Sequence, residues 1–227
     1  MLKMKLLTVL GVTLAATFAS GTMTTSALAL PDISIALGGS YPLRGQFADN
    51  GTTQVKLETT GGSIIEGKGL AMSGSIEELS ASGNAELEIL GVKTGKTACH
   101  SQSDKEEEVL VKDTLALVPV RLAPLEIGIL HTGQEVEIIC GKIKIKIKGA
   151  VIDTLNAGEG ELTEVGGKLE GSKGKNTLTK YFNDEGHEVE ARLEANFGTG
   201  FLQADVTVGE EIKIKALEGK MFEITGR

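Results

Sequence analysis

Hydrophobic and charged residues alternate one by one along several segments of this 227-residue chain. The clearest alternating segments are residues 54–58, 85–90, 135–139, 203–208 and 211–215. In an extended chain, this alternation places apolar side chains on one face and charged side chains on the other, as in half-buried antiparallel strands. Only residues 75–81 and 191–197 have the composition of one or two helical turns, and neither segment is long enough for an amphipathic helix.

Residues that favour turns separate the alternating segments. They occur at residues 49–51, 60–62, 82–84, 158–160, 171–174 and 183–186. Glycine makes up 30 of the 227 residues, which is about twice the usual share of roughly 7%. The pattern predicts an all-β protein, folded as an antiparallel β-sandwich or a β-barrel.

A short internal similarity bears on the domain organisation. The sequence IIEGK at residues 64–68 is echoed by IICGK at residues 138–142, and each copy follows a Thr-Gly pair. Two explanations remain open: two similar β halves of about 90 residues each, or convergence of strand and turn sequences in a chain rich in Gly, Ile and Lys. If there are two halves, the boundary is expected near residues 119–124, where two prolines disfavour a central strand.

The first 29 residues have the three parts of a signal peptide. Two lysines near the start are followed by an apolar run at residues 6–19 and by an Ala-Leu-Ala cleavage pattern at residues 27–29. The apolar run is shorter than the roughly 20 residues that a membrane-spanning helix needs. We therefore predict a secreted mature chain, residues 30–227, with no membrane span. The alternative is an uncleaved anchor.

The charge balance excludes some classes of partner. Residues 1–29 contain two lysines and no acidic residue, so their removal changes the formal net charge from −8 to −10. A nucleic-acid-binding protein needs a basic surface for phosphates, so we predict no nucleic-acid partner. Aromatic residues make up 4% of the chain and Trp is absent, which leaves few ring faces for sugars.

Two cysteines, Cys99 and Cys140, remain after removal of the signal peptide. In an exported protein such a pair predicts one disulfide, closing a loop of about 40 residues. Two free thiols are the alternative. The absence of a Cys-x-x-Cys spacing argues against a metal site.

Four lysines alternate with isoleucines and would lie on one face of a strand: Lys142, Lys144, Lys146 and Lys148. One interpretation is a contact surface for a polyanion. The other, which we favour, is a solvated face whose charges are balanced by acidic residues on neighbouring strands.

No catalytic or cofactor-binding motif emerges from the chain. His100, His131 and His187 are scattered, without the spacing of metal ligands, and we expect them at the surface or rim of the fold. No Gly-x-Ser-x-Gly sequence is present. Residues 91–97 differ from a phosphate-binding loop by one residue between the glycines. We therefore predict no catalytic residue, no cofactor and no metal.

Residues 140–152 resemble the central segment of a family of uncharacterised, secreted, β-rich actinobacterial proteins. Members of that family carry Cys-Gly, a lysine–valine alternation and a Gly-Ser-Val-Ile-Gly end. Further matches lie at residues 57–59, 93–96, 193–198 and 221–224 and at Cys99. The resemblance, over residues 54–224, implies export and a β-rich fold. Glu66 stands where members often carry another cysteine, and the family has no assigned activity from which site residues could be transferred.

Taken together, these features predict a secreted, non-enzymatic β protein whose surface binds a protein partner or a cell-envelope component. The alternatives are a β-barrel that holds a small apolar ligand and a hydrolase with an unrecognised site. A filled core would favour the first, and a cavity of about 300 Å³ or more with a few polar groups the second. A cleft with clustered titratable groups would favour the hydrolase.

Overall fold

The all-β prediction is confirmed, and the strands close into an antiparallel barrel. The computed structural model describes residues 40–47, 55–77, 82–101, 105–155, 160–162, 164–209, 212–215 and 222–224. This part of the chain contains no helix. The predicted signal peptide lies outside the described residues.

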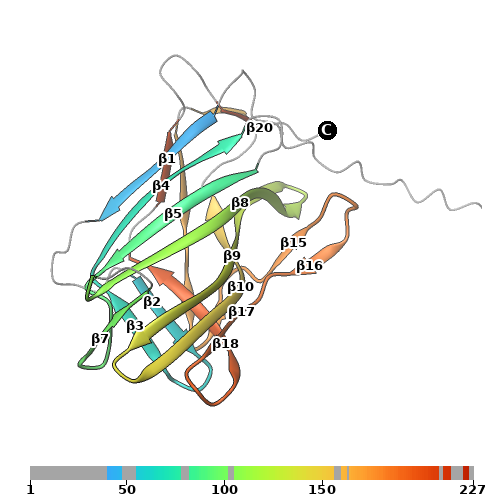
Figure 1. Ribbon diagram of the computed structural model, residues 1–227. Coiled ribbons are helices and arrows are strands. Elements are labelled where there is room, and N and C mark those ends of the chain that lie inside the picture. Colours follow the sequence, from blue (N-terminus) through green and yellow to red (C-terminus); the bar gives the residue numbers. More distant parts are fainter. Residues whose placement is uncertain are drawn as a thin grey trace, which may run out of the picture.

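The strands of the barrel form two rings, because β9 and β10 pair with each other in addition to their other neighbours. Eight strands close the first ring in the order β1-β19-β12-β10-β9-β8-β5-β4. Their bounds are β1 (Ser40–Phe47), β4 (Gly69–Glu77), β5 (Ser82–Leu90), β8 (Glu108–Leu122), β9 (Leu125–Cys140), β10 (Ile143–Leu155), β12 (Glu164–Lys168) and β19 (Ile212–Lys215). Figure 1 shows β1, β4, β5 and β8 side by side in this ring.

The second ring continues β9 and β10 toward the turn that joins them. Its order is β10-β17-β18-β2-β3-β6-β7-β9. Its other strands are β2 (Val55–Thr59), β3 (Ile64–Gly67), β6 (Lys93–Thr94), β7 (Thr97–His100), β17 (Leu193–Asn196) and β18 (Phe201–Val208). The two long strands β9 and β10 thus run through both rings (Figure 1).

Three short two-stranded sheets complete the structure. They are β11 (Gly160–Leu162) with β20 (Phe222–Ile224), β13 (Gly171–Ser172) with β14 (Lys175–Asn176), and β15 (Lys180–Phe182) with β16 (Glu188–Glu190). The β15–β16 hairpin covers the outer face of the barrel, where Leu178 and Tyr181 pack against the apolar cluster of Val118, Leu130 and Ile152. Strands β8, β9 and β10 are therefore buried on both faces here, and their sequences are continuously apolar rather than alternating.

The alternating segments and most of the turns lie where the sequence predicts them. The described residues of all five alternating segments fall in strands, namely β2, β5, β9, β18 and β19, and the turns at residues 60–62, 171–174 and 183–186 are present. The turn predicted at residues 82–84 is wrong, because β5 already begins at Ser82. The turn predicted at residues 49–51 lies outside the described residues, as do residues 158 and 159 of the turn predicted at residues 158–160, whose Gly160 begins β11.

The short helix predicted at residues 191–197 is also wrong. This segment contains β17, in which Leu193 and Ala195 are buried and alternate with Glu194 and Asn196, which are only partly so. Pairing with β10 and β18 on its two sides satisfies the backbone of β17, and this outweighs its weak helical preference. In the other proposed helical segment, residues 75–77 end strand β4.

The two rings do not follow the boundary expected near residues 119–124. Those residues lie in the β8–β9 hairpin, and both of its strands belong to the first ring. The two copies of the internal similarity lie together in the second ring, in β3 and at the end of β9. The division of the barrel is thus made by strand pairing in space and not by two successive halves of the chain.

The rings meet at Gly149, where a bulge interrupts the pairing of β10 with β9 between Ile147 and Gly149. Gly149 has a φ of 112°, and a Cβ atom there would lie 2.0 Å from the backbone oxygen of Arg192. Gly133, its pairing partner on β9, has room for a side chain, since the nearest atom to an added Cβ is 3.7 Å away. The bulge therefore depends on glycine at residue 149 and not at residue 133.

Gly149→Ala is expected to destabilise the protein by about 2 kcal/mol, because alanine is strained at this φ and its Cβ collides with backbone. Gly133→Ala is the matched control and is expected to change the free energy of unfolding by less than about 0.5 kcal/mol. Urea unfolding of the two variants measures both values. Equal effects of the two substitutions would contradict this account of the bulge.

Candidate functional site

An apolar cavity of about 160 Å³ lies inside the barrel, between the two rings. Side chains of the first ring contribute Leu87, Ile89 and Val111, and those of the second contribute Leu57, Ile65 and Val136. Asp113 and His131 also line the cavity. Lys148 contributes at the bulge, but its Nζ atom lies outside, 3.8 Å from Glu194 and 4.0 Å from the centre of the Phe201 ring. The cavity is thus aliphatic, with an acid and a histidine as the polar side chains that face it.

A buried cluster of Asp113, His131 and Asp153 forms the polar end of this cavity. The Nδ1 atom of His131 donates a hydrogen bond of 2.5 Å to Oδ2 of Asp113. On the other side of the imidazole ring, Nε2 lies 3.1 Å from Oδ2 of Asp153. This contact is an ion pair and does not have the geometry of a hydrogen bond. The exposed fractions of Asp113, His131 and Asp153 are 7%, 6% and 0%.

Strand register brings the three side chains together. His131 is the directly opposed partner of both Leu115 on β8 and Val151 on β10. Asp113 precedes Leu115 by two residues on β8, and Asp153 follows Val151 by two residues on β10. The cluster therefore crosses the three strands diagonally. All three side chains share the inward face of the sheet. The residue directly opposite Asp113 on β9 is Gly133.

The two carboxyl groups set the protonation of His131. Burial alone would lower the pKa of this histidine, but the attraction of Asp153 and the hydrogen bond to Asp113 outweigh burial and raise the pKa to about 10. His131 is therefore an imidazolium at neutral pH. With both ring nitrogens protonated it offers no lone pair to a metal and cannot act as a general base.

This pKa makes the stability of the protein pH-dependent. The ordinary pKa of histidine is 6.5, and the folded value is about 10. The stabilisation is therefore complete below about pH 6.5 and is lost as the pH rises toward 10, at roughly 1.4 kcal/mol per pH unit. We expect the free energy of unfolding to fall by about 2 kcal/mol between pH 6.5 and 8.5, because the unfolded histidine is still half protonated at pH 6.5. Urea unfolding across this range measures it, and a flat profile would contradict a charged His131.

Several oxygens of the cluster have no hydrogen-bond donor among the described residues. They are Oδ1 of Asp113, Oδ1 of Asp153 and Oδ2 of Asp153, the last of which is held by the ion pair with His131. Two carboxyl groups face one imidazolium, so the formal charge of the cluster is −1. Polar atoms that are buried without a partner are costly and need a reason in a native fold.

The described residues around the cluster offer no nucleophile or metal site. No hydroxyl or thiol group of the described chain is hydrogen-bonded to His131. Among the same residues, no group of three or more His, Cys, Asp and Glu side chains is arranged to hold a metal ion. The arrangement can therefore hold charge and accept hydrogen bonds, and it lacks the parts of a Ser-His-Asp system.

The predicted disulfide is present between Cys99 on β7 and Cys140 on β9, with a sequence separation of 41. The two cysteines are directly opposed partners in the β7–β9 pairing, and both are buried in the core of the second ring. The disulfide therefore joins the strands that close this ring.

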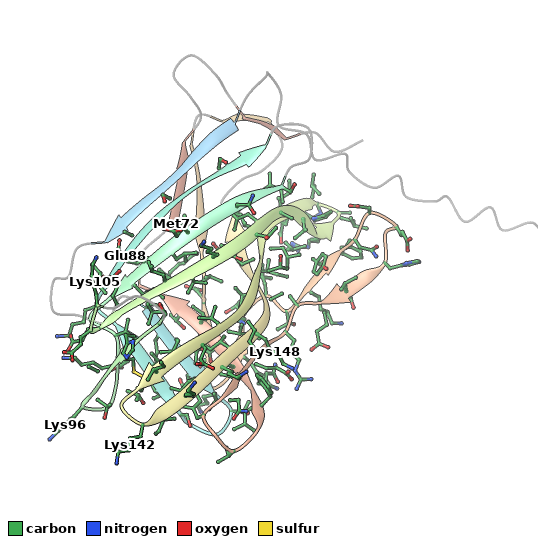
Figure 2. All side chains as sticks on the ribbon, viewed as in Figure 1. Met72, Glu88, Lys96, Lys105, Lys142 and Lys148 are labelled. Carbon is green, nitrogen blue, oxygen red and sulfur yellow. A yellow bond between two sulfur atoms is a disulfide. The ribbon has the colours of Figure 1, made fainter. Side chains whose placement is uncertain are left out.

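The four lysines of the alternating run are mostly balanced by acidic residues. Lys144 pairs with Glu137 at 3.0 Å and Lys146 with Glu135 at 2.6 Å, both across the β9–β10 pairing. The hydrogen bond to Glu135 raises the pKa of Lys146. Lys148 lies near Glu194, while Lys142 projects from the β9–β10 turn, as Figure 2 shows. This geometry gives little free positive charge for a polyanion.

The three histidines have different environments. His187 is exposed, and His100 is partly buried, with Nδ1 2.8 Å from the backbone oxygen of Ser101. The expectation that His131 lies at the surface or rim is wrong, since it is buried between two aspartates. Asp113 and Asp153 were not predicted as site residues, although each occupies an inward position in a strand.

Comparisons with protein families, curated proteins and solved structures find no match to this chain. Among the described residues, no helix has the length and apolar character to cross a membrane.

Proposed function

We propose that the mature protein is a secreted, non-enzymatic binding protein that holds a small apolar molecule inside its barrel. The single observation that carries this proposal is the aliphatic cavity between the rings. The buried disulfide also fits an oxidising, extracellular location. We place the ligand-binding alternative above a surface contact, because an apolar cavity inside the barrel costs packing energy that a purely structural core avoids.

The size of the cavity limits the ligand. At about 160 Å³ it is smaller than the roughly 300 Å³ that we expected of a ligand-binding barrel, so the proposal is restricted to very small ligands. An engineered apolar cavity of about 150 Å³ in another protein binds benzene or xenon. The ligand is therefore about the size of benzene, and fatty acids or fused-ring compounds are too large.

Xenon and benzene test the proposal directly. We expect xenon to give an exchange-broadened or shifted ¹²⁹Xe signal with the purified protein, and benzene to raise the melting temperature in proportion to its occupancy. Gly133→Val should abolish both effects, because a side chain there enters the cavity without meeting backbone closely.

Thr114→Val is the matched control for Gly133→Val. Residue 114 neighbours Asp113 but is exposed on the opposite face of β8, so its substitution should leave binding intact. Absence of binding by both probes to the wild-type protein would overturn the proposal.

A surface contact with a protein partner or a cell-envelope component is the second candidate. The observation that favours it is a set of exposed apolar side chains, Ile143, Phe201 and Leu202, on strands β10 and β18 of the second ring. Affinity capture from the producing organism's culture medium and envelope fraction tests it. A specific partner should be captured by the wild-type protein and lost with the double variant Phe201→Ser, Leu202→Ser.

A further inference from the structure

We propose that the ligand of the cavity carries a cationic amine head group on its apolar body, and that Asp113 is the residue that binds this amine. This inference rests on the proposed function, since it names the chemistry of a ligand for the same cavity.

Asp113 has one carboxyl oxygen without a hydrogen-bond donor in the described part of the protein. Asp113 lines the cavity, and its Oδ2 atom is already used by the hydrogen bond from His131. Its Oδ1 atom is buried and has no donor in the described part of the protein. A ligand that donates a hydrogen bond to Oδ1 would satisfy this atom and remove the cost of leaving it without a partner.

The charge of the cluster selects the kind of donor. With His131 protonated between two carboxyl groups, the cluster keeps a formal charge of −1 inside an apolar enclosure. The lysine nearest the cavity, Lys148, directs its ammonium group toward Glu194 and Phe201 instead. An ammonium head therefore completes the charge balance, and a charge-assisted hydrogen bond is stronger than one from a neutral hydroxyl.

The remainder of the cavity defines the rest of the ligand. Its walls are aliphatic side chains such as Leu57, Ile89 and Val136, which favour a hydrocarbon body. The volume of about 160 Å³ allows roughly the bulk of benzene for the body and head together. The class of ligand is thus a compact primary amine with one small alkyl or cycloalkyl group.

Three molecules of nearly equal size test the head group: cyclopentylamine, cyclopentanol and methylcyclopentane. We expect cyclopentylamine to bind the wild-type protein at least tenfold more tightly than methylcyclopentane, with cyclopentanol between them. Titration calorimetry and thermal shift at pH 7 measure the order. Equal binding of the amine and the alcohol, or tighter binding of the hydrocarbon, would overturn the inference while leaving the proposed function intact. If none of the three binds although xenon or benzene does, the inference fails and the proposed function stands.

Two isosteric variants locate the effect. Asp113→Asn keeps an oxygen that can accept the hydrogen bond from His131 but removes the charge, and should abolish the preference for the amine. Asp205→Asn is the matched control, because Asp205 is also buried, with 1% of its surface exposed against 7% for Asp113, but does not line the cavity; its Oδ2 atom accepts a hydrogen bond of 2.6 Å from the Gly174 amide. This control should retain the preference. If Asp113→Asn does not fold, the order of the three ligands on the wild-type protein still decides the question.

Discussion

His131→Leu is expected to lower the free energy of unfolding at pH 6.5 by about 3–5 kcal/mol, the range for removing one partner from a buried ionic group. Leucine fills much of the same volume but leaves Asp113 and Asp153 buried without a cation. The loss of charge balance, rather than a cavity, therefore dominates the effect. Urea unfolding at fixed pH measures it.

Two further histidine variants isolate the cause. His187→Leu should have almost no effect, because the His187 side chain is about three-quarters exposed, at 75%. His131→Gln keeps a hydrogen-bond donor for Asp113 but carries no charge, so it should be less stable than the wild type and lack the loss of stability between pH 6.5 and 8.5. A loss of less than about 1 kcal/mol for His131→Leu would mean that the cluster is not a charged one.

The fold was largely predictable because the barrel is built from strands with one buried face. In β2, for example, Val55, Leu57 and Thr59 are buried and alternate with Lys56 and Glu58. Such alternation identifies a strand without knowledge of its neighbours. Strand order and ring closure were not predictable, because they depend on pairings such as that of β9 with β10, which runs through both rings.

The cluster was not predicted because its members are far apart in the chain. Asp113 and His131 are 18 residues apart, and only the register of β8 and β9 makes them neighbours. A usable signal was nevertheless present. Each cluster residue interrupts the apolar side of its strand, as Asp113 does between Val111 and Leu115. A polar residue at an inward position must find a buried partner, and three such residues in three consecutive strands predict that they meet.

The cavity and the cluster have a common structural origin. Gly133 lies on the inward face opposite Asp113, and the bulge at Gly149 lies opposite Gly133. Gly133 has no side chain to fill the space beside Asp113, whereas backbone atoms of Arg192 occupy the place of a Cβ atom at Gly149. The place where the two rings join is therefore both the least filled and the most polar part of the interior. The alternation of apolar and charged residues does not reveal where the two rings join, because glycine is compatible with either face of a strand.

Replacing Cys99 and Cys140 together by alanine is expected to destabilise the protein by about 4 kcal/mol, the chain-entropy value for a loop of 41 residues. The disulfide also stabilises a part of the second ring in which few residue pairs join the strands. This ring is closed on one side by β6 and β7, which have two and four residues, and β7 pairs with β9 through Cys99 and His100.

The position of the disulfide predicts where the double variant will open first. Without the covalent link, two residue pairs hold β7 against β9, whereas β9 and β10 are paired over nearly their full lengths. In the double variant, exchange of the backbone amides should therefore accelerate first at residues 99 and 100 of β7, and only later in the β9–β10 pairing. The wild-type protein under reducing conditions should reproduce both the loss of stability and this exchange pattern. Uniform acceleration over the whole barrel, with no early opening at β7, would show that the disulfide acts on the unfolded chain alone and that the remaining contacts suffice to close the second ring.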